Sequence, residues 1–362
     1  MSKLRIGIIF GGKSAEHEVS LQSAKNVVAA LDQNKYEPVL IGIDKAGVWH
    51  LQDNAAFLLN AEDPKLVTLN ASGKDLALVP GQDNQLIGAK EQGLSGQIDV
   101  VFPVLHGTYG EDGTMQGLLK LLDIPFVGPS VLGSAVGMDK DVSKRLLRDA
   151  GIPVSKFLTF KNSEPISFEI VEKELGLPVF VKPANLGSSV GISKAKDKEG
   201  FEAAIKLAFE FDNKIIIEEY IKGREIECAV LGNDSPKASI PGEVIPRGHE
   251  FYSYEAKYID ENGAELKIPA ELSDKEIVTA QALAIKTFKT LELSGLSRVD
   301  FFLDEQGKFF VNEVNTIPGF TKISMYPKLW EATGLPYTGL IDTLIQLAIE
   351  RHNKEKQLKT TV

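Results

Sequence analysis

The 362-residue sequence has little of several features that mark whole classes of proteins. It contains one cysteine, Cys228, which has no partner for an internal disulfide, so we expect a reducing compartment. The net charge of −10 leaves no basic excess to neutralise nucleic-acid phosphates. No apolar run approaches the length of a membrane span, and the start, MSKLRIGIIFGG, lacks a signal-peptide pattern. We therefore expect a cytoplasmic protein that binds neither membranes nor nucleic acid.

The composition is that of a soluble globular protein, with 43% hydrophobic and 25% charged residues. A chain of this length exceeds the usual size of one core, so two or three domains are expected. In the first third, apolar runs at 4–10, 39–43 and 99–105 alternate with helical patterns and predict a mostly parallel βα arrangement. Residues 53–97 are polar and rich in glycine, which is typical of a decorated surface stretch.

The segment GIIFGGKS, which begins at Gly7, matches the P-loop pattern of nucleotide-binding proteins letter for letter. A working P-loop has its first glycine after the strand, so that the following backbone amides can wrap phosphates. Here the residues after Gly7 continue the strand, and Glu16 and Glu18 would repel a triphosphate. The pattern favours an ordinary strand–turn–helix. A P-loop NTPase or switch that acts through Lys13 and Ser14 is the alternative.

Two runs rich in β-branched and aromatic residues, 299–303 and 308–314, flank a turn-like segment and predict a β-hairpin. With a two-residue loop, the opposed pairs are Asp300 with Glu313 and Arg298 with Asn315. A four-residue loop shifts this pairing but keeps the carboxylates on one face, and a bulge could break that arrangement. Because strand side chains alternate, four residues of the second run should share one face: Phe309, Val311, Glu313 and Asn315.

Like charges opposite each other destabilise a sheet unless a positive group lies between them. Oxygen ligands without histidine or cysteine suit a hard cation such as magnesium. The hairpin acids therefore indicate a metal site, with a solvated sheet face as the alternative.

A predicted strand that ends in Lys182 is followed by the small-residue loop GSSVG, residues 187–191. Small residues let backbone amides and hydroxyls approach phosphate oxygens, and Lys182 adds a positive charge. A later strand ends in Glu218 and Glu219, with Glu225 close by, and such a polar edge could bind an adenine and a ribose. A flexible hairpin loop and ordinary polar strand ends are the alternatives.

The glycine turn before Ser14 leads into a helix whose free amides can hold a carboxylate, while Glu16 could bind an ammonium. These two charges together describe an amino acid, although helix capping explains the same residues. His106 ends a strand before two glycines, which suits either a ligand-facing loop or a structural histidine. Residues 247–270 include a long irregular stretch, typical of a lid, that contains Lys257 and Tyr258.

Seven motifs together carry a resemblance to a known family: HGTYGEDG, MDK, KPANLGSSVG, EEYIKGRE, YEAKY, SRVDFF and NEVNTIPGFT. In this order, and from Phe10 to about Pro327, the sequence resembles the D-alanine–D-alanine ligases of the ATP-grasp superfamily. The resemblance implies an α/β ATP-grasp fold of three domains. These are a Rossmann-like parallel-sheet domain over residues 1–130 and two α+β domains that clasp ATP, over 131–222 and 223–362. A homodimer is implied as well.

The resemblance also implies ATP as a substrate. It assigns ATP to Lys140, Lys182, Ser188, Ser189, Glu218, Glu219, Ile221, Glu225, Lys257 and Asn312. Among these, the lysines would contact phosphates, Glu218 the adenine amino group and Glu225 the ribose. Two magnesium ions, or manganese, would be held by Asp300, Glu313 and Asn315.

The implied reaction joins two D-alanines through a D-alanyl phosphate, for peptidoglycan precursor synthesis. Residues implied for the two D-alanines are Glu16, His106, Arg298, Gly319, Ser324 and Met325. The implied catalytic set comprises Glu16, Ser188, Tyr258, Arg298, Gly319 and Ser324. In it, Glu16, Ser188 and Tyr258 lock the lid, while Arg298 and the Gly319 amide stabilise the oxyanion. Tyr258 favours D-alanine as second substrate over the family's alternatives, D-lactate and D-serine.

Overall fold

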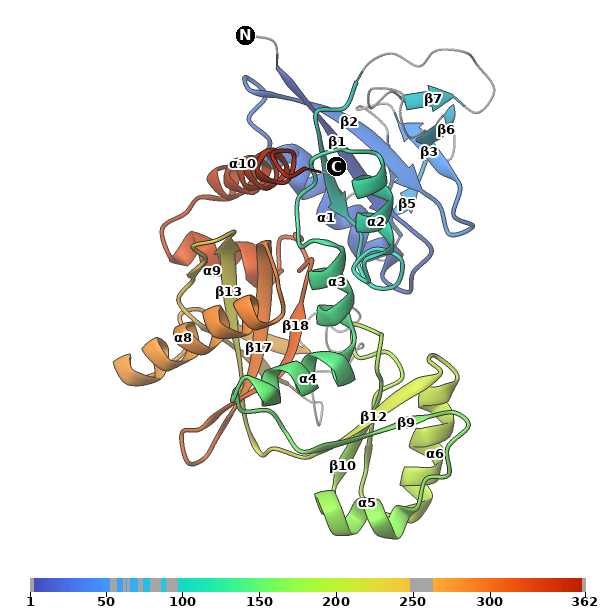
Figure 1. Ribbon diagram of the computed structural model, residues 1–362, viewed down its shortest axis with the longest axis vertical. Helices are drawn as coiled ribbons and strands as arrows, with labels where there is room; N and C mark the ends of the chain where they lie inside the picture. Colours follow the sequence, from blue (N-terminus) through green and yellow to red (C-terminus); the bar gives the residue numbers. More distant parts are fainter. Residues whose placement is uncertain are drawn as a thin grey trace.

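The computed structural model describes residues 3–52, 57–60, 63, 66–70, 74–78, 86–88, 97–247 and 263–359. Three main sheets follow one another along the long axis of the molecule (Figure 1). No helix in these ranges is long and apolar enough to cross a membrane.

The first sheet has the strand order β7-β6-β3-β2-β1-β8. Its strands are β1 (Leu4–Gly11), β2 (Tyr36–Ile43), β3 (Trp49–Gln52), β6 (Lys74–Leu78), β7 (Leu86–Gly88) and β8 (Val100–Val104). The predicted apolar strand β1 lies between β2 and β8 and is parallel to both. The outer strands β3, β6 and β7 are antiparallel to their neighbours, so the sheet is mixed rather than mostly parallel.

The stretch 53–97, expected as surface decoration, therefore adds strands to this sheet. It contributes β6 and β7, and also the small antiparallel pair β4 (Leu58–Leu59) and β5 (Thr68–Leu69). These strands are two to five residues long, too short for an alternating pattern to reveal them.

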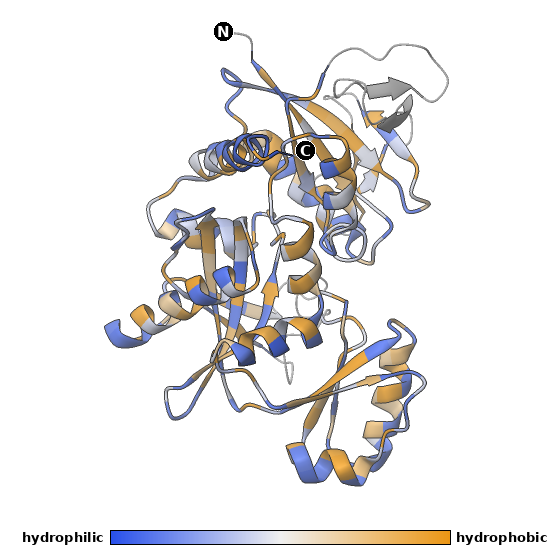
Figure 2. Ribbon diagram, in the orientation of Figure 1, coloured by the Kyte–Doolittle hydropathy of each residue, from blue (hydrophilic) through white to orange (hydrophobic). Residues whose placement is uncertain are grey.

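Helices from both ends of the chain cover the first sheet. α1 (His17–Ala30) and the C-terminal α10 (Tyr337–Glu355) bury Leu21 and Leu344 in one core with Ile6 and Ile8 of β1. α2 (Thr114–Leu121) packs in a separate core with Ile9. Much of β1 and β2 is orange in Figure 2, as expected for strands covered on both faces.

The second sheet is fully antiparallel, with the order β11-β10-β12-β9. Its strands are β9 (Phe157–Lys161), β10 (Val179–Pro183), β11 (Ser193–Ala195) and β12 (Lys214–Glu219). α5 (Phe168–Leu175) and α6 (Lys198–Phe209) pack on the face that carries Val181 and Ile217. α5 begins after its cap Ser167 and ends before Gly176. Strand alternation turns Lys182 and Glu218 to the opposite face.

The third sheet has the order β16-β15-β13-β17-β18, and β14 also pairs with β13. Its strands are β13 (Gly223–Gly232), β14 (Lys237–Ala238), β15 (Gly242–Pro246), β16 (Ala264–Lys267), β17 (Gly295–Asp304) and β18 (Phe309–Asn315). The associated helices are α3 (Val131–Met138), α4 (Lys140–Asp149), α8 (Asp274–Thr290) and α9 (Met325–Ala332). β16 lies within the range predicted as a lid, so part of that range is strand.

The hairpin β17–β18 has the register expected from the sequence, although its loop differs. Asp300 lies opposite Glu313, and Arg298 lies opposite Asn315. The closing hydrogen bond runs from the N–H of Asp304 to the carbonyl of Lys308 at 3.1 Å, so the loop has three residues, 305–307, rather than two. Gly307, with φ of +78°, provides the left-handed residue that such loops use.

A bulge at Asn312 compensates for the longer loop. Val311 pairs with Phe301, Glu313 pairs with Asp300, and Asn312 between them has no opposite residue. The extra residue reverses the alternation, so Val311 is buried in the core while Glu313 faces away from it. The prediction that Phe309, Val311, Glu313 and Asn315 share one face is therefore wrong.

The bulge can be tested with two aspartate substitutions. Val314 is 7% exposed and packs in the core, so Val314→Asp should cost roughly 4 kcal/mol or more of stability. Asn312 is on the other face, so Asn312→Asp should fold with nearly unchanged stability. Circular dichroism melting of both variants measures the difference. Without a bulge the two residues would share a face, and equal melting temperatures would contradict the observed arrangement.

Candidate active site

A cavity of about 390 Å³ lies between the second and third sheets, and we call it the large cavity. This volume is typical of small-molecule sites. Residues predicted for ATP and metal that line it are Lys182, Ser189, Glu218, Glu219, Ile221, Glu225, Asp300, Asn312 and Glu313. The sequence motifs of the central and last thirds of the chain therefore meet at one place.

Glu218 of β12 is buried among positive groups. Its Oε2 accepts a hydrogen bond from Ser155 Oγ at 3.0 Å and lies 3.3 Å from Lys144 Nζ and 3.2 Å from Lys182 Nζ. Burial pushes the pKa of this carboxyl upward, but the two ammonium groups hold the pKa below its ordinary value. The second oxygen, Oε1, is buried and has no hydrogen-bond partner within the described part of the chain. This acceptor fits an amino group of a ligand in the large cavity.

Lys144 is a site residue that sequence reasoning missed. It lies on α4, is 1% exposed, and its Nζ also donates to Ser155 Oγ at 3.0 Å. Burial lowers the pKa of Lys144 despite the nearby Glu218 carboxylate. Lys144 follows Lys140 by four residues, so both lysines lie on the same side of the helix, and this spacing is the signal that could have found it.

Lys140 links the start of α4 to the hairpin. Its Nζ donates to the carbonyl of Leu186 at 2.6 Å and lies 3.3 Å from Glu313 Oε2. Its backbone N–H donates to the carbonyl of Ala184 at 3.0 Å. Two of the three lysines predicted for phosphate contacts, Lys140 and Lys182, are therefore buried, and each contacts a side chain of β18.

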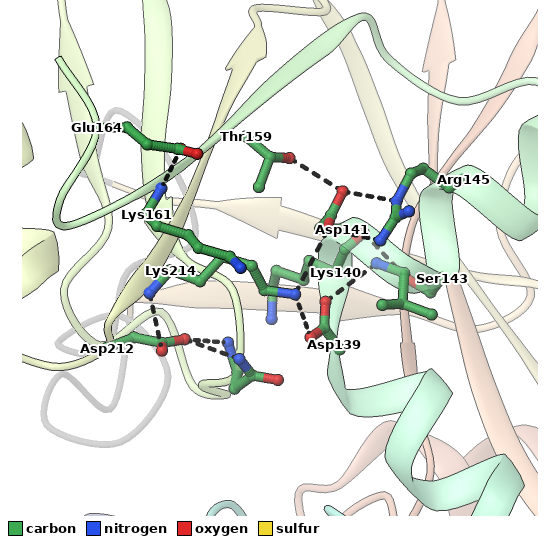
Figure 3. Close-up of polar contacts among 12 residues, drawn as sticks. Asp139, Lys140, Asp141, Ser143, Arg145, Thr159, Lys161, Glu164, Asp212 and Lys214 are labelled. Carbon is green, nitrogen blue, oxygen red and sulfur yellow. Dashed lines mark hydrogen bonds and ion pairs between the residues drawn. The ribbon is translucent and has the colours of Figure 1, made fainter. Parts of the chain in front are cut away.

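A cluster of charges fixes the start of α4 against the second sheet (Figure 3). Asp139 caps the helix by accepting an amide hydrogen of the first turn at 3.0 Å. Lys214 Nζ of β12 pairs with Asp139 and lies 3.4 Å from Asp141 Oδ2. Arg145 and Thr159 also donate to Asp141. The cluster explains how Lys140 is held beside β10 and β12.

The acids of β17 are neutralised by a guanidinium from the same strand. Nε and Nη2 of Arg298 each donate to one oxygen of Asp300 at 2.7 Å. Arg298 Nε also lies 2.8 Å from Glu227 Oε2 of β13. Asn315 Nδ2 donates to Asp300 Oδ2 at 2.9 Å. Arg298 is therefore shared by Asp300 and Glu227, two like charges that face each other across β17 and β13.

The predicted metal ligands Asp300, Glu313 and Asn315 lie together on the hairpin. Their donors are two carboxylates and an amide, a set of hard oxygens that fits magnesium better than zinc or copper. Within the described ranges, no group of three or more His, Cys, Asp or Glu side chains is close enough to hold a metal ion. Asn312, added to the same face by the bulge, accepts from Lys182 Nζ at 3.2 Å.

A second cavity of about 90 Å³ shares Glu227 with the large cavity, and we call it the small cavity. Every residue predicted for the amino-acid substrates lines it: Glu16, His106, Arg298, Gly319, Ser324 and Met325. Ser188 and Asn315 line it as well. Arg298 and Asp300 are two positions apart on β17. Arg298 lines the small cavity and Asp300 lines the neighbouring large cavity.

Glu16, just before α1, contacts the GSSVG loop of the second sheet. Its Oε1 accepts a hydrogen bond from Ser188 Oγ. A Cβ added to Gly187 would lie 2.9 Å from Glu16 Oε2, so a larger residue there would displace this carboxylate. Tyr258, the third member of the predicted set, and Lys257 lie outside the described residues.

His106 and Glu111 lie in the loop that follows β8. Burial lowers the pKa of His106 to about 4, so its ring is neutral at pH 7. Burial, together with the nearby Glu16 carboxylate, raises the pKa of Glu111 to about 8. Glu111 lines the small cavity but was not among the predicted site residues. The motif HGTYGEDG indicated a functional loop, but it did not indicate that the side chain of Glu111 points into the small cavity.

The P-loop alternative is wrong. Gly7 lies within β1, paired with Val39 and Val101, and no phosphate-wrapping turn follows it. Lys13 and Ser14 instead line another cavity, of about 320 Å³, together with Gly11 and Gly12. The residues expected of a P-loop therefore lie away from the large cavity.

Two antiparallel sheets that enclose a lysine-lined cavity, beside a mixed α/β sheet, define an ATP-grasp protein. The chain belongs to the D-alanine–D-alanine ligase family. The family model for the D-Ala–D-Ala ligase N-terminus matches residues 5–129, and that for the C-terminus matches residues 146–346.

Relatives match over the whole chain. A D-alanine–D-alanine ligase of Shouchella clausii is 59% identical over 100% of this chain and 99% of its own. The structure of the D-alanine–D-alanine ligase from Coxiella burnetii has a TM-score of 0.86 at 40% identity, covering 99% of this chain and 97% of that one. The D-Ala:D-Ser ligase VanG from Enterococcus faecalis has a TM-score of 0.84 at 38% identity, covering 96% and 100%. The fold alone therefore does not distinguish the second substrate.

Replacement of Lys144 tests the buried ion pairs. Among the residues that the structure describes, Lys144→Met leaves Lys182 as the only ammonium partner of Glu218, and an undercompensated buried charge is destabilising. We expect the free energy of unfolding to fall by about 3 kcal/mol, measured by urea titration with circular dichroism. Lys173→Met, at an exposed position of α5, is the matched control and should leave the unfolding midpoint unchanged. Equal midpoints for both variants would contradict this account of Glu218.

Proposed function

We propose that this protein joins two D-alanine molecules into D-alanyl-D-alanine at the expense of ATP, for peptidoglycan precursor synthesis. The observation that carries the proposal is the placement of β17 between the two cavities. Arg298 lines the small, amino-acid-sized cavity, and Asp300 lines the large cavity. A terminal phosphate and a substrate carboxylate would therefore meet at this strand.

The large cavity supplies groups for each part of ATP. Oε1 of Glu218, which has no hydrogen-bond partner among the described residues, accepts the adenine amino group, and the backbone near Glu219 and Ile221 borders the ring. Glu225 binds the ribose. Phosphate contacts come from Lys140, Lys182, Ser188, Ser189, Asn312 and, from the lid, Lys257. Fixed positive charges are the main requirement of phosphoryl transfer, which depends on positioning and charge neutralisation.

Asp300, Glu313 and Asn315 would hold two magnesium ions, with manganese as a substitute. When bound, these ions supply positive charge that neutralises the phosphate oxygens. The bulged hairpin places the carboxylates of Asp300 and Glu313 in the lining of the large cavity without the help of a ligand.

The reaction proceeds in two steps. Glu16 binds the ammonium of the first D-alanine, whose carboxylate attacks the γ-phosphate to give D-alanyl phosphate and ADP. The neutral amine of a second D-alanine, bound near Ser324 and Met325, then attacks the activated carbonyl, and phosphate leaves. Arg298 and the Gly319 amide stabilise the oxyanion, a contribution of about 3–4 kcal/mol per donor. Closure of a lid that bears Tyr258 keeps water from the acyl phosphate.

The domain division at 1–130, 131–222 and 223–362 belongs to the same proposal, and it is supported by one main sheet in each range. A cytoplasmic location and a homodimer complete it.

Substrate dependence tests the function directly. The protein is mixed with ATP, magnesium and one of D-alanine, L-alanine, D-serine plus D-alanine, or D-lactate plus D-alanine. We expect phosphate release with D-alanine but not L-alanine, and D-alanyl-D-alanine as the product found by mass spectrometry. No D-alanine-dependent phosphate release would overturn the ligase proposal. Dominant mixed products would instead reassign the second substrate.

Nucleotide selectivity tests the role of Glu218. Inosine triphosphate has a carbonyl where ATP has the adenine amino group, so it cannot donate to the Glu218 carboxylate. We expect the KM for inosine triphosphate to exceed that for ATP by about 10-fold or more, since a hydrogen bond to a charged group is worth about 1.5–3 kcal/mol. In Glu218→Gln this ratio should approach one, because an amide can donate to the inosine carbonyl. The same ratio in both proteins would place the adenine elsewhere.

A further inference from the structure

Residues 316–320 follow β18 and form one wall of the small cavity through Ile317, Pro318 and Gly319. In the sequence they directly follow the last strand of the third sheet. Several hydrogen bonds to their backbone nevertheless come from the first third of the chain, from α1 and from the loop after β8.

Both backbone polar groups of Ile317 are bonded to side chains of that loop. Its N–H donates to Glu111 Oε1 at 3.0 Å, and its carbonyl oxygen lies 3.0 Å from His106 Nδ1. The other oxygen of Glu111 accepts from the N–H of Gly107 at 2.7 Å, and the hydroxyl of Thr316 donates to the Glu111 carbonyl at 3.3 Å. Glu111 thus joins its own loop to residues 316 and 317.

The hydrogen bonds of His106 have a defined direction. The ring is neutral and carries one N–H, and the carbonyl of Ile317 can only accept, so the proton is on Nδ1. Nε2 then accepts from Ser23 Oγ at 3.0 Å, and Ser23 Oγ accepts from the N–H of Phe320 at 3.1 Å. Both ring nitrogens are committed to protein groups, which does not suit a direct contact between His106 and a substrate.

The Gly319 amide differs from the amides of Ile317 and Phe320. Pro318 has no N–H, and the N–H groups of Ile317 and Phe320 are bonded as above. The carbonyl of Phe320 accepts from Asn26 Nδ2 at 3.1 Å. The N–H of Gly319 has no hydrogen-bond partner among the residues that the structure describes. Its neighbours on both sides are fixed while it borders the small cavity together with Arg298.

We propose that His106 and Glu111 are positioning residues that hold the Gly319 amide where the oxyanion of the tetrahedral intermediate forms. This inference rests on the proposed ligase function. Donors to an oxyanion are effective only when they are fixed in advance, and a displacement of about 1 Å can cost about 100-fold in rate. The first third of the chain thereby assembles part of a catalytic group that the last third carries.

A matched pair of substitutions at His106 tests the bond to Ile317. The amide nitrogen of asparagine lies near the place of Nδ1, whereas that of glutamine lies near Nε2. We expect His106→Gln to lower kcat by about 10- to 100-fold with little change in the KM for ATP, and His106→Asn to recover part of that loss. Glu111→Gln, which replaces one acceptor oxygen by a donor facing an N–H, should behave like His106→Gln.

The acyl phosphate can either return to ATP or go on to the dipeptide. The ratio of these two reactions distinguishes loss of Gly319 positioning from a general loss of active-site structure. Positional isotope exchange in ¹⁸O-labelled ATP reports return of the intermediate to ATP, and dipeptide formation reports its forward reaction. Because only the forward step needs the Gly319 amide, the ratio of exchange to dipeptide should rise by about 10-fold or more in His106→Gln and Glu111→Gln. A purely structural defect lowers both rates together and leaves the ratio unchanged, which would overturn the inference.

Two controls complete the experiment. Glu172→Gln, at an exposed position of α5, should match the unmodified protein in kcat and in the exchange ratio. If Glu111→Gln does not fold, Ser23→Ala removes the acceptor of the Phe320 N–H without changing charge, and the same rise in ratio is expected. An inactive unmodified protein would refute the proposed ligase function. If the unmodified protein is active and His106→Gln, Glu111→Gln and Ser23→Ala all have normal kcat, this inference alone is refuted.

Discussion

Compensation of buried charge is the constraint on which the centre of this structure depends. The chain carries a net charge of −10, yet it buries acids between its sheets. A buried carboxylate is tolerated only when cations and hydrogen-bond donors surround it. Glu218 has Lys144 and Lys182, Asp300 has Arg298, and Glu313 has Lys140. Several of these pairs join different secondary-structure elements, so the packing of α4 and of the sheets is tied to the same charges.

The same constraint acts on the hairpin. Asp300 and Glu313 face each other across β17 and β18, an arrangement that would destabilise a sheet by itself. Arg298 binds both oxygens of Asp300, and Lys140 approaches Glu313 from the start of α4. The position of that helix start depends in turn on the Asp139–Lys214 pair (Figure 3). A local feature of one hairpin therefore requires contacts from segments more than a hundred residues away in sequence.

The sequence predicts the features that local patterns control. Caps at Ser167 and Ser273 fix the starts of α5 and α8, and the apolar run of β1 is a strand. The hairpin register was predicted correctly because two one-residue differences offset each other, a longer loop and a bulge that the two-residue-loop prediction did not include. The bulge lies beside Val311, whose N–H donates to the carbonyl of Pro153 at 2.8 Å, a contact with a distant segment that no local pattern reports.

Buried polar residues were the hardest part of the site to predict. Lys144 and Glu111 read in sequence as surface residues of a helix and a loop, since charged side chains are mostly exposed. Their burial depends on partners such as Glu218 and Ile317, which only the fold brings near. The ligand-facing residues were easier to predict, because the residue types in their motifs match the chemical groups of the ligand.

Under the proposed function, the charge pairs of the unliganded site also prepare it for its ligands. A triphosphate would draw Lys140 and Lys182 toward its oxygens, and metal ions would take over the carboxylates of Asp300 and Glu313. Each carboxylate then exchanges one positive partner for another, and no acid is left uncompensated at any stage. Because Asp300 is already buried and both acids are already paired with cations, ligand binding requires a change of partners more than the desolvation of new charge. The ion pairs that stabilise the fold are for this reason the same groups that would bind the nucleotide and its metal.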